Sequence, residues 1–150
     1  MKLSEHFSLI EFTASDTAAR RGIDNTLPGG LIPTAQVTAQ MLERIRAELG
    51  SLPVIITSGF RCLELNAAIG SSSTSDHPKA CAVDFKCPAF GSPYEVAKRL
   101  APLLDRLGIG QIIHEYGQWV HASTRTPSKI INRVITITDA GVVPGIVGLA

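Results

Sequence analysis

The residues best suited to chemistry are a buried aspartate and the histidines that surround it in the sequence. Asp84 lies inside the apolar run CAVDFKC, and His77 precedes it by seven residues, directly after a serine-rich stretch; His114 and His121 follow in a strand-rich tail. A carboxylate among apolar side chains is costly unless a partner neutralises it. Asp84 and two of these histidines would leave a fourth position for water, which is the ligand arrangement of catalytic zinc.

Zinc in such a site would lower the pKa of a bound water to about 7 and create a nucleophile at neutral pH. The spacing alone leaves a second interpretation open. In that interpretation, Asp84 is a buried carboxylate that accepts hydrogen bonds from backbone N–H groups of the serine-rich stretch.

The elements that would position these residues are mostly short strands and turns. PVIITSGF predicts a buried strand that enters a tight turn at Gly59, and LELNAAIG predicts a short helix ended by Gly70. CAVDFKC predicts a strand. GQIIHEY and WVHAST flank Gly117 and Gln118 and predict a hairpin, and RVITITDAGVVPGI predicts another that turns near residues 139–141.

Helices are expected mainly in the first two thirds of the chain. Ser8 and Glu11 form a capping-box pattern in SLIEF, and SDTAARRG predicts a second short helix. A long helix is expected over residues 33–49, with a buried stripe formed by Val37, Met41, Ile45 and Leu49. SPYEVAKRLAPLLDRLG predicts another, kinked at Pro102. Helices first and antiparallel strands mostly last indicate an α+β fold.

Bulk properties indicate one globular domain over residues 1–150. The apolar fraction is 45% and the charged fraction 18%, as in ordinary folded proteins. A net charge of +1 with scattered lysines and arginines argues against nucleic-acid binding. We expect no signal peptide and no membrane insertion, because no apolar segment approaches about 20 residues. Three cysteines are an odd number, which favours free thiols over a disulfide framework.

Three segments resemble, in order, the motifs of a known family. SDHPKACAVDF resembles the S-x-H-x-x-G-x-A-x-D signature of the zinc D-Ala-D-Ala carboxypeptidase family of murein peptidases. That family also includes D-Ala-D-Ala dipeptidases and phage L-Ala-D-Glu endopeptidases. TSGFRCLELNAAIG resembles the upstream S-G-x-R segment, and WVHAS the downstream W-x-H segment. The likeness covers most of the chain and is closest to compact versions encoded by phages and prophages.

The resemblance implies a small antiparallel sheet that carries the zinc site and packs with helices, as in hedgehog and DD-peptidase folds. It implies that His77, Asp84 and His121 bind one Zn²⁺ ion. Arg61 resembles the arginine that holds a substrate carbonyl or carboxylate and stabilises the oxyanion; a structural salt bridge is its alternative. Ser75 would bind substrate or support its loop, and Trp119 would line the cleft or belong to the core.

Two positions depart from the family pattern. Ala80 replaces the motif glycine, which would strain the backbone if φ is positive there. Gln118 stands where many relatives carry a carboxylate, and glutamine cannot accept a proton from water. The nearest carboxylate is Glu115. A two-residue hairpin loop would put His114 on the zinc face, whereas one extra loop residue would put Glu115 there. We predict Glu115 as the base, with His114 as the alternative and as a candidate for substrate binding.

These features together predict a zinc metallopeptidase that cuts peptidoglycan stem peptides or cross-links, as a carboxypeptidase or endopeptidase. The bond could be D-Ala-D-Ala, the D-Ala-diaminopimelate cross-link or L-Ala-D-Glu. The expected setting is a monomeric phage or prophage lysis enzyme, held in the host cytoplasm until it reaches the cell wall or periplasm, or carried by the virion. Gln118 supports an alternative, a non-catalytic zinc-binding structural phage protein.

Overall fold

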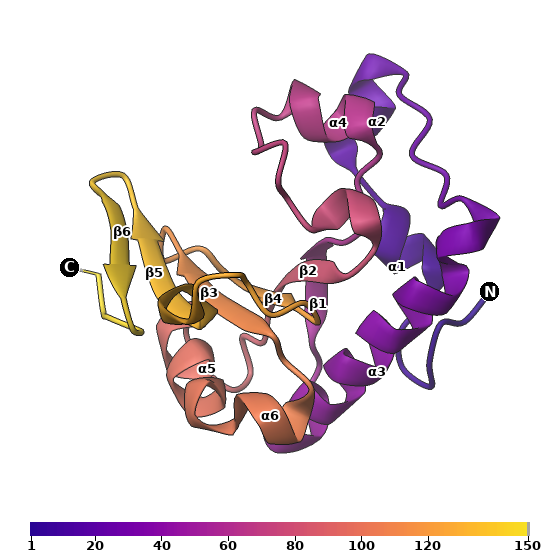
Figure 1. Ribbon diagram of the computed structural model, residues 1–150. Coiled ribbons are helices and arrows are strands. Elements are labelled where there is room, and N and C mark those ends of the chain that lie inside the picture. Colours follow the sequence, from indigo (N-terminus) through magenta and orange to yellow (C-terminus); the bar gives the residue numbers. More distant parts are fainter. Residues whose placement is uncertain (150) are drawn as a thin grey trace.

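The computed structural model describes residues 1–149 and has a mixed α and β architecture. Figure 1 shows a twisted sheet, two helical segments below it, and an N-terminal helical region beside it. The α-helices are α1 (Leu9–Thr13), α2 (Asp16–Arg21), α3 (Ile32–Glu48), α4 (Leu63–Ala68), α5 (Pro93–Leu100) and α6 (Leu104–Leu107). The strands are β1 (Ile55–Ser58), β2 (Ala82–Lys86), β3 (Gln111–Glu115), β4 (Trp119–Ser123), β5 (Val134–Thr138) and β6 (Gly141–Pro144).

The six strands form one sheet in the order β1-β2-β4-β3-β5-β6. Neighbouring strands run antiparallel except β3 and β5, which are parallel. The two predicted hairpins are β3–β4 and β5–β6, and together with β2 they account for most of the sheet. The predicted α+β fold with a mainly antiparallel sheet is therefore confirmed.

Strand β1 corrects one expectation. The run PVIITSGF was expected to form a buried strand, but β1 is an outer strand at one end of the sheet order, and Ile55 is 52% exposed. Its apolar composition reflects β-propensity and a half-buried face rather than complete burial. Its partner β2 is an interior, buried strand that carries Asp84.

The long helix α3 also differs from its expected packing. Its buried face contains Ala35, Ala39, Leu42 and Ile45, whereas Val37 is 56% exposed. A strict four-residue spacing advances about 40° per step around a helix of 3.6 residues per turn, so Val37 lies about 80° from Ile45. The helix packs with small residues near its start, and Thr38 Oγ1 donates a hydrogen bond to Ala80 O at 2.8 Å.

At the other helix ends, capping residues, proline and glycine act as the sequence predicted. Ser8 and Glu11 form the expected capping box of α1. Pro102 interrupts the segment after α5, where a 3-10 turn (Ala101–Leu103) separates α5 from α6, and Gly108 ends α6 with a positive φ. The α5 and α6 segments cover one face of the sheet, which leaves the other face to the candidate site (Figure 1).

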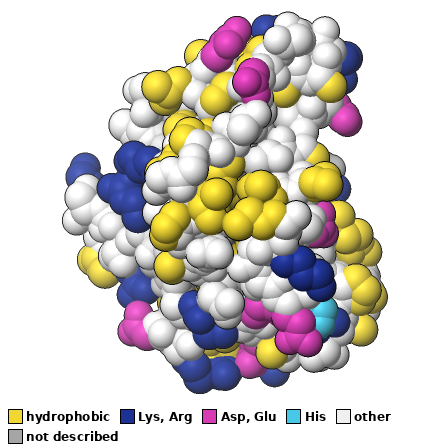
Figure 2. Space-filling view, turned by 90° about the vertical axis from the view of Figure 1, so that its right-hand side faces the viewer, with side chains coloured by type: hydrophobic (Ala, Val, Ile, Leu, Met, Phe, Trp, Pro, Cys, Tyr) yellow, Lys and Arg dark blue, Asp and Glu magenta, His cyan; other side chains and the backbone are white. Residues whose placement is uncertain are grey.

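The side of the molecule formed by α1 and α3 has a mixed surface. Figure 2 shows hydrophobic side chains near the centre of this face, with side chains of both charges around them. The interspersed signs agree with the net charge of +1. No helix in residues 1–149 is long and apolar enough to cross a membrane, and Cys62, Cys81 and Cys87 are free thiols.

Candidate metal centre

A row of side chains crosses the sheet from strand to strand and forms the floor of the candidate site. Ser58 pairs with Asp84, Asp84 pairs with His121, and His121 pairs with Ile113. Residues paired in this way project their side chains to the same face. Register alone therefore brings Asp84 and His121 together, although they are 37 positions apart in the chain.

His77 lies in the loop that precedes β2, and its side chain contacts this row. A 3-10 turn (His77–Lys79) begins at this residue, and Ser75 Oγ accepts a hydrogen bond from His77 N at 3.2 Å. Nδ1 of His77 lies 2.6 Å from Gly59 O. A carbonyl can only accept, so Nδ1 carries a proton, and Nε2 is the ring nitrogen that would bind a metal ion. That Nε2 lies 3.3 Å from Asp84 Oδ1.

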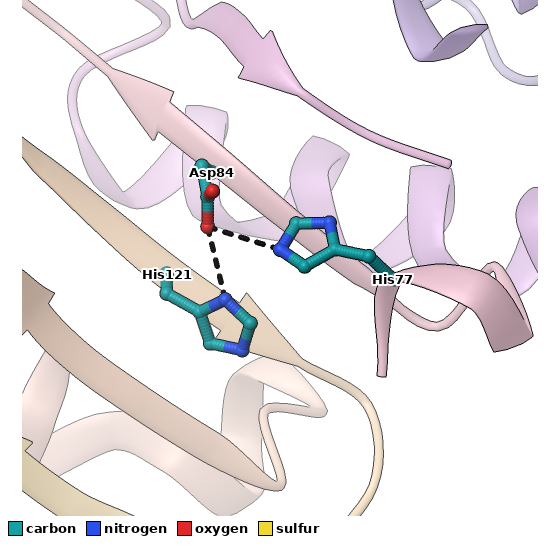
Figure 3. Close-up of side chains that lie close together, drawn as sticks. All are labelled: His77, Asp84 and His121. Atoms are coloured by element: carbon teal, nitrogen blue, oxygen red, sulfur yellow. Dashed lines mark hydrogen bonds and ion pairs between the residues drawn. The ribbon is translucent and has the colours of Figure 1, made fainter. Parts of the chain in front are cut away.

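Asp84 lies between the two imidazoles, as Figure 3 shows. Its Oδ1 is 2.9 Å from His121 Nδ1. Burial opposes ionisation of Asp84, but attraction and hydrogen bonds from both histidines outweigh it and hold its pKa well below the usual range. Burial lowers the pKa of His77, whereas for His121 the hydrogen bond and charge of Asp84 outweigh burial and raise the pKa.

The three side chains fit a metal ion. One ligand atom from each of His77, Asp84 and His121 lies within 4.8 Å of the others, and all three residues are buried. Two nitrogens and one carboxylate oxygen form a donor set suited to zinc, with a position left open for water or substrate. The hydrogen bond from His77 to Gly59 O is the kind of outer contact that orients a metal-binding imidazole. An ion here would offset the burial of Asp84.

Asp76 supports this arrangement, although we did not single it out in the sequence. It accepts hydrogen bonds from Ser123 Oγ at 2.8 Å and from Arg125 Nη1 at 2.5 Å. These bonds connect the loop just before His77 to the end of β4, two residues beyond His121. An acidic residue next to a candidate ligand was the available signal, but its partners are 47 and 49 positions away.

Glu115 lies on the same face as the histidines because the β3–β4 loop has three residues, 116–118. Glu115 pairs with Trp119, and Ile113 pairs with His121. The two-residue loop that would have placed His114 beside His121 does not form. Glu115 Oε1 lies 3.7 Å from His121 Nδ1. Burial raises the pKa of Glu115, and the charge of Asp84 raises it further.

His114 lies on the opposite face of the sheet. It is 1% exposed, its Nδ1 is 3.0 Å from Val147 O, and its ring is 6.0 Å from the ring of Tyr94 on α5. The sheet separates it from the cavity, since it pairs with Val120 rather than His121. We therefore assign His114 neither proton transfer nor substrate binding.

Arg61 lies after β1 and lines the same cavity as the three candidate ligands. Burial lowers the pKa of its guanidinium, while the charges of Asp84 and Glu115 act in the opposite direction. Arginine stays protonated under these conditions. Its Nη2 lies 3.5 Å from Ser71 Oγ, but its Nε is buried and finds no hydrogen-bond partner among residues 1–149. The bond to Ser71 uses one of the five guanidinium N–H groups, which leaves other Nη donors for a ligand.

The cavity has a volume of about 860 Å³ and two chemically different walls. One wall is rich in hydroxyl groups and comes from the serine-rich loop, including Ser75. The other is apolar and comes from the sheet and its hairpin. The apolar residues are Ile113, Tyr116, Trp119 and Ile137. Ser75 also donates its backbone N–H to Ser72 O, so it both supports its loop and reaches the cavity.

Comparison with known proteins adds one result. The family model described as "Peptidase M15" matches residues 5–123, which is more than half of the chain and includes His77, Asp84, His121, Glu115 and Arg61. No curated protein matches the sequence significantly.

Proposed function

The chain belongs to the peptidase M15 family, and we propose that it is a zinc peptidase that hydrolyses an amide bond in the peptide stems or cross-links of peptidoglycan. His77, Asp84 and His121 would bind the ion. When bound, zinc supplies a Lewis acid and lowers the pKa of a coordinated water. The observation that carries the proposal is a half-buried carboxylate, Glu115, that faces a His–Asp–His set within one cavity.

Glu115 is the group we assign to proton transfer. Its raised pKa suits a base that accepts a proton from the attacking water and then returns it to the leaving nitrogen. Water adds to the carbonyl carbon, the carbon–nitrogen bond breaks, and the amine leaves with the proton held by Glu115. Arg61 stabilises negative charge on the carbonyl oxygen through its free donors.

The width of the cavity supports a substrate longer than a dipeptide. Residues that line it come from β1, β2, β4, β3 and β5, which are successive strands of the sheet. Strand spacing of about 4.8 Å gives a floor roughly 19 Å wide. An extended peptide advances about 3.5 Å per residue, so roughly five residues fit across it. A peptidoglycan stem or cross-link is a substrate of this length.

The position of Glu115 argues against the non-catalytic alternative. Gln118, in the hairpin turn, had suggested that the base is missing. Its backbone N–H donates to Glu115 O at 2.9 Å and so helps to close the turn. The carboxylate that faces the histidines is supplied by Glu115, at the end of β3. We further propose a role in cell-wall lysis for a phage or prophage, because the three motifs are most similar to compact proteins of that kind.

The direct test is digestion of purified peptidoglycan by the zinc-loaded protein, followed by mass spectrometry of the released fragments. We expect fragments that differ from the starting material by one hydrolysed amide bond, and the new ends identify which bond is cut. Stoichiometric zinc without any hydrolysis product would contradict the proposal.

A further inference from the structure

The short segment that carries Arg61 has no regular secondary structure of its own. Residues 59–62 connect β1 to α4, and Gly59 and Phe60 are buried. Buried backbone groups need hydrogen-bond partners. Phe60 N donates to Phe12 O at 2.7 Å, and Gly59 O is bonded to His77 as described above. The two groups that flank Arg61, Phe60 O and Cys62 N, must find partners elsewhere.

Asn25 supplies both of these partners with one side chain. Its Nδ2 donates to Phe60 O at 2.9 Å, and its Oδ1 accepts from Cys62 N at 2.8 Å. A residue of a parallel neighbouring strand would bond the same two groups, so the amide replaces a strand partner for Arg61. Nδ2 also donates to Thr13 O at 2.9 Å, which fixes the end of α1 to the same point.

Only an amide of this length satisfies all three bonds. The donor nitrogen faces two carbonyl oxygens and the acceptor oxygen faces an N–H, so the network allows a single orientation of the side chain. Aspartate would lack the donors, and alanine would lack every partner. Asn25 is buried and does not line the cavity. Its contacts with the site therefore pass through the backbone on either side of Arg61.

We propose that Asn25 is the positioning residue for Arg61: it holds the backbone of Arg61 from both sides and so aims the guanidinium at the substrate carbonyl. The role of Arg61 in that aim rests on the proposed function. The placement of Arg61 by Asn25 can be measured without any substrate.

The test uses hydrogen exchange of arginine Nε–H groups, observed by NMR in the zinc-loaded protein. The signal lost in Arg61→Lys identifies Arg61. Its buried Nε–H should exchange slowly in the wild type, and Asn25→Ala should speed exchange at least tenfold. Two internal controls come from Arg44 Nε, which donates to Leu107 O at 2.8 Å, and Arg133 Nε, which donates to Gly110 O at 2.9 Å. Their exchange should change less than twofold.

A matched variant separates positioning from general loss of stability. Thr136 Oγ1 donates to Gly145 O at 2.8 Å and accepts from Val147 N at 3.0 Å, on the face of the sheet away from the cavity. Thr136→Val also removes buried hydrogen bonds, yet it should leave Arg61 exchange unchanged. Asn25→Ser introduces no charge and serves if Asn25→Ala does not fold; it should show the same selective increase.

Activity provides a second readout. Asn25→Ala should lower kcat/KM on peptidoglycan fragments about 100-fold while one zinc per chain remains bound, because small misplacements of a catalytic group cost about that much. Unchanged Arg61 exchange, or equal acceleration at Arg61, Arg44 and Arg133, would overturn the positioning role. A wild-type protein that cleaves nothing would refute the proposed function alone, since the exchange measurement needs no cleavage.

Discussion

Glu115 and His121 lie on neighbouring strands and on the same face of the sheet, with Glu115 Oε1 3.7 Å from His121 Nδ1. This relationship depends on a three-residue loop, since a two-residue loop would bring His114 to that face instead. The proposed division of work follows from it. His121 would complete the metal site, and Glu115 would be close enough to exchange a proton with water at that site.

Replacing Asp84 tests the metal site. Asp84→Asn removes the charge of one proposed ligand, and we expect zinc affinity to fall by more than about 100-fold, beyond the usual effect of outer contacts. Chelator competition and the zinc content after dialysis measure this. Asp105→Asn is the matched control, because Asp105 is 92% exposed and far from the cavity. Equal zinc affinity in wild type and Asp84→Asn would contradict the ligand assignment.

Removing zinc should lower the stability of the fold. An ion that binds only the folded chain at 100 times its Kd contributes about 2.7 kcal/mol, which corresponds to roughly 5–11 °C in Tm for a chain of this size. Thermal melting with and without a chelator measures the shift. Asp84→Asn should show little shift on chelation, and a wild-type Tm insensitive to zinc would argue against the site.

Ala80 should tolerate glycine but not a larger residue. Its φ is +60°, where a non-glycine residue costs about 1–2 kcal/mol. Ala80→Gly relieves that strain, but it loses a buried methyl worth about 0.8 kcal/mol and gains about 0.4–1 kcal/mol of unfolded-state freedom. These effects nearly cancel, so stability should change by less than about 1 kcal/mol. Ala80→Val should destabilise by more than about 2 kcal/mol, because it is overpacked and strained. Urea unfolding compares all three proteins.

Arg61→Lys should separate substrate chemistry from metal binding. Lysine keeps the charge but loses the planar fork of donors, so we expect kcat/KM to fall about 100-fold or more with zinc content unchanged. Arg106→Lys makes the same replacement at a surface ion pair with Glu48 and should leave kcat/KM as it is. Full activity in Arg61→Lys would show that the guanidinium is dispensable.

Local patterns predicted much of this molecule, and long-range contacts account for what they missed. Capping residues located the starts of α1 and α5, and turn residues located both hairpins. Periodicity wrongly predicted that Val37 and all of β1 are buried, because burial depends on which elements pack together. The parallel pairing of β3 with β5 likewise joins segments with no local signal.

In the candidate site, too, local motifs predicted some residues and long-range contacts determine the others. The motifs pointed to His77, Asp84 and His121, which the fold brings together. The choice between Glu115 and His114 depends on whether the β3–β4 loop has two or three residues, and the sequence alone does not decide between these lengths. Asn25 and Asp76 were missed because their partners lie 12 to 49 positions away, and no spacing rule connects them.

Glu115→Gln tests whether Glu115 accepts the proton from water, because it keeps the size of the side chain and removes its ability to accept a proton. The measurement is hydrolysis of purified peptidoglycan by zinc-loaded wild type and Glu115→Gln, with zinc per chain determined on the same samples. We expect one zinc in both proteins and a fall in kcat of at least about 100-fold in the variant. A wild-type kcat in zinc-loaded Glu115→Gln would show that Glu115 is not the base.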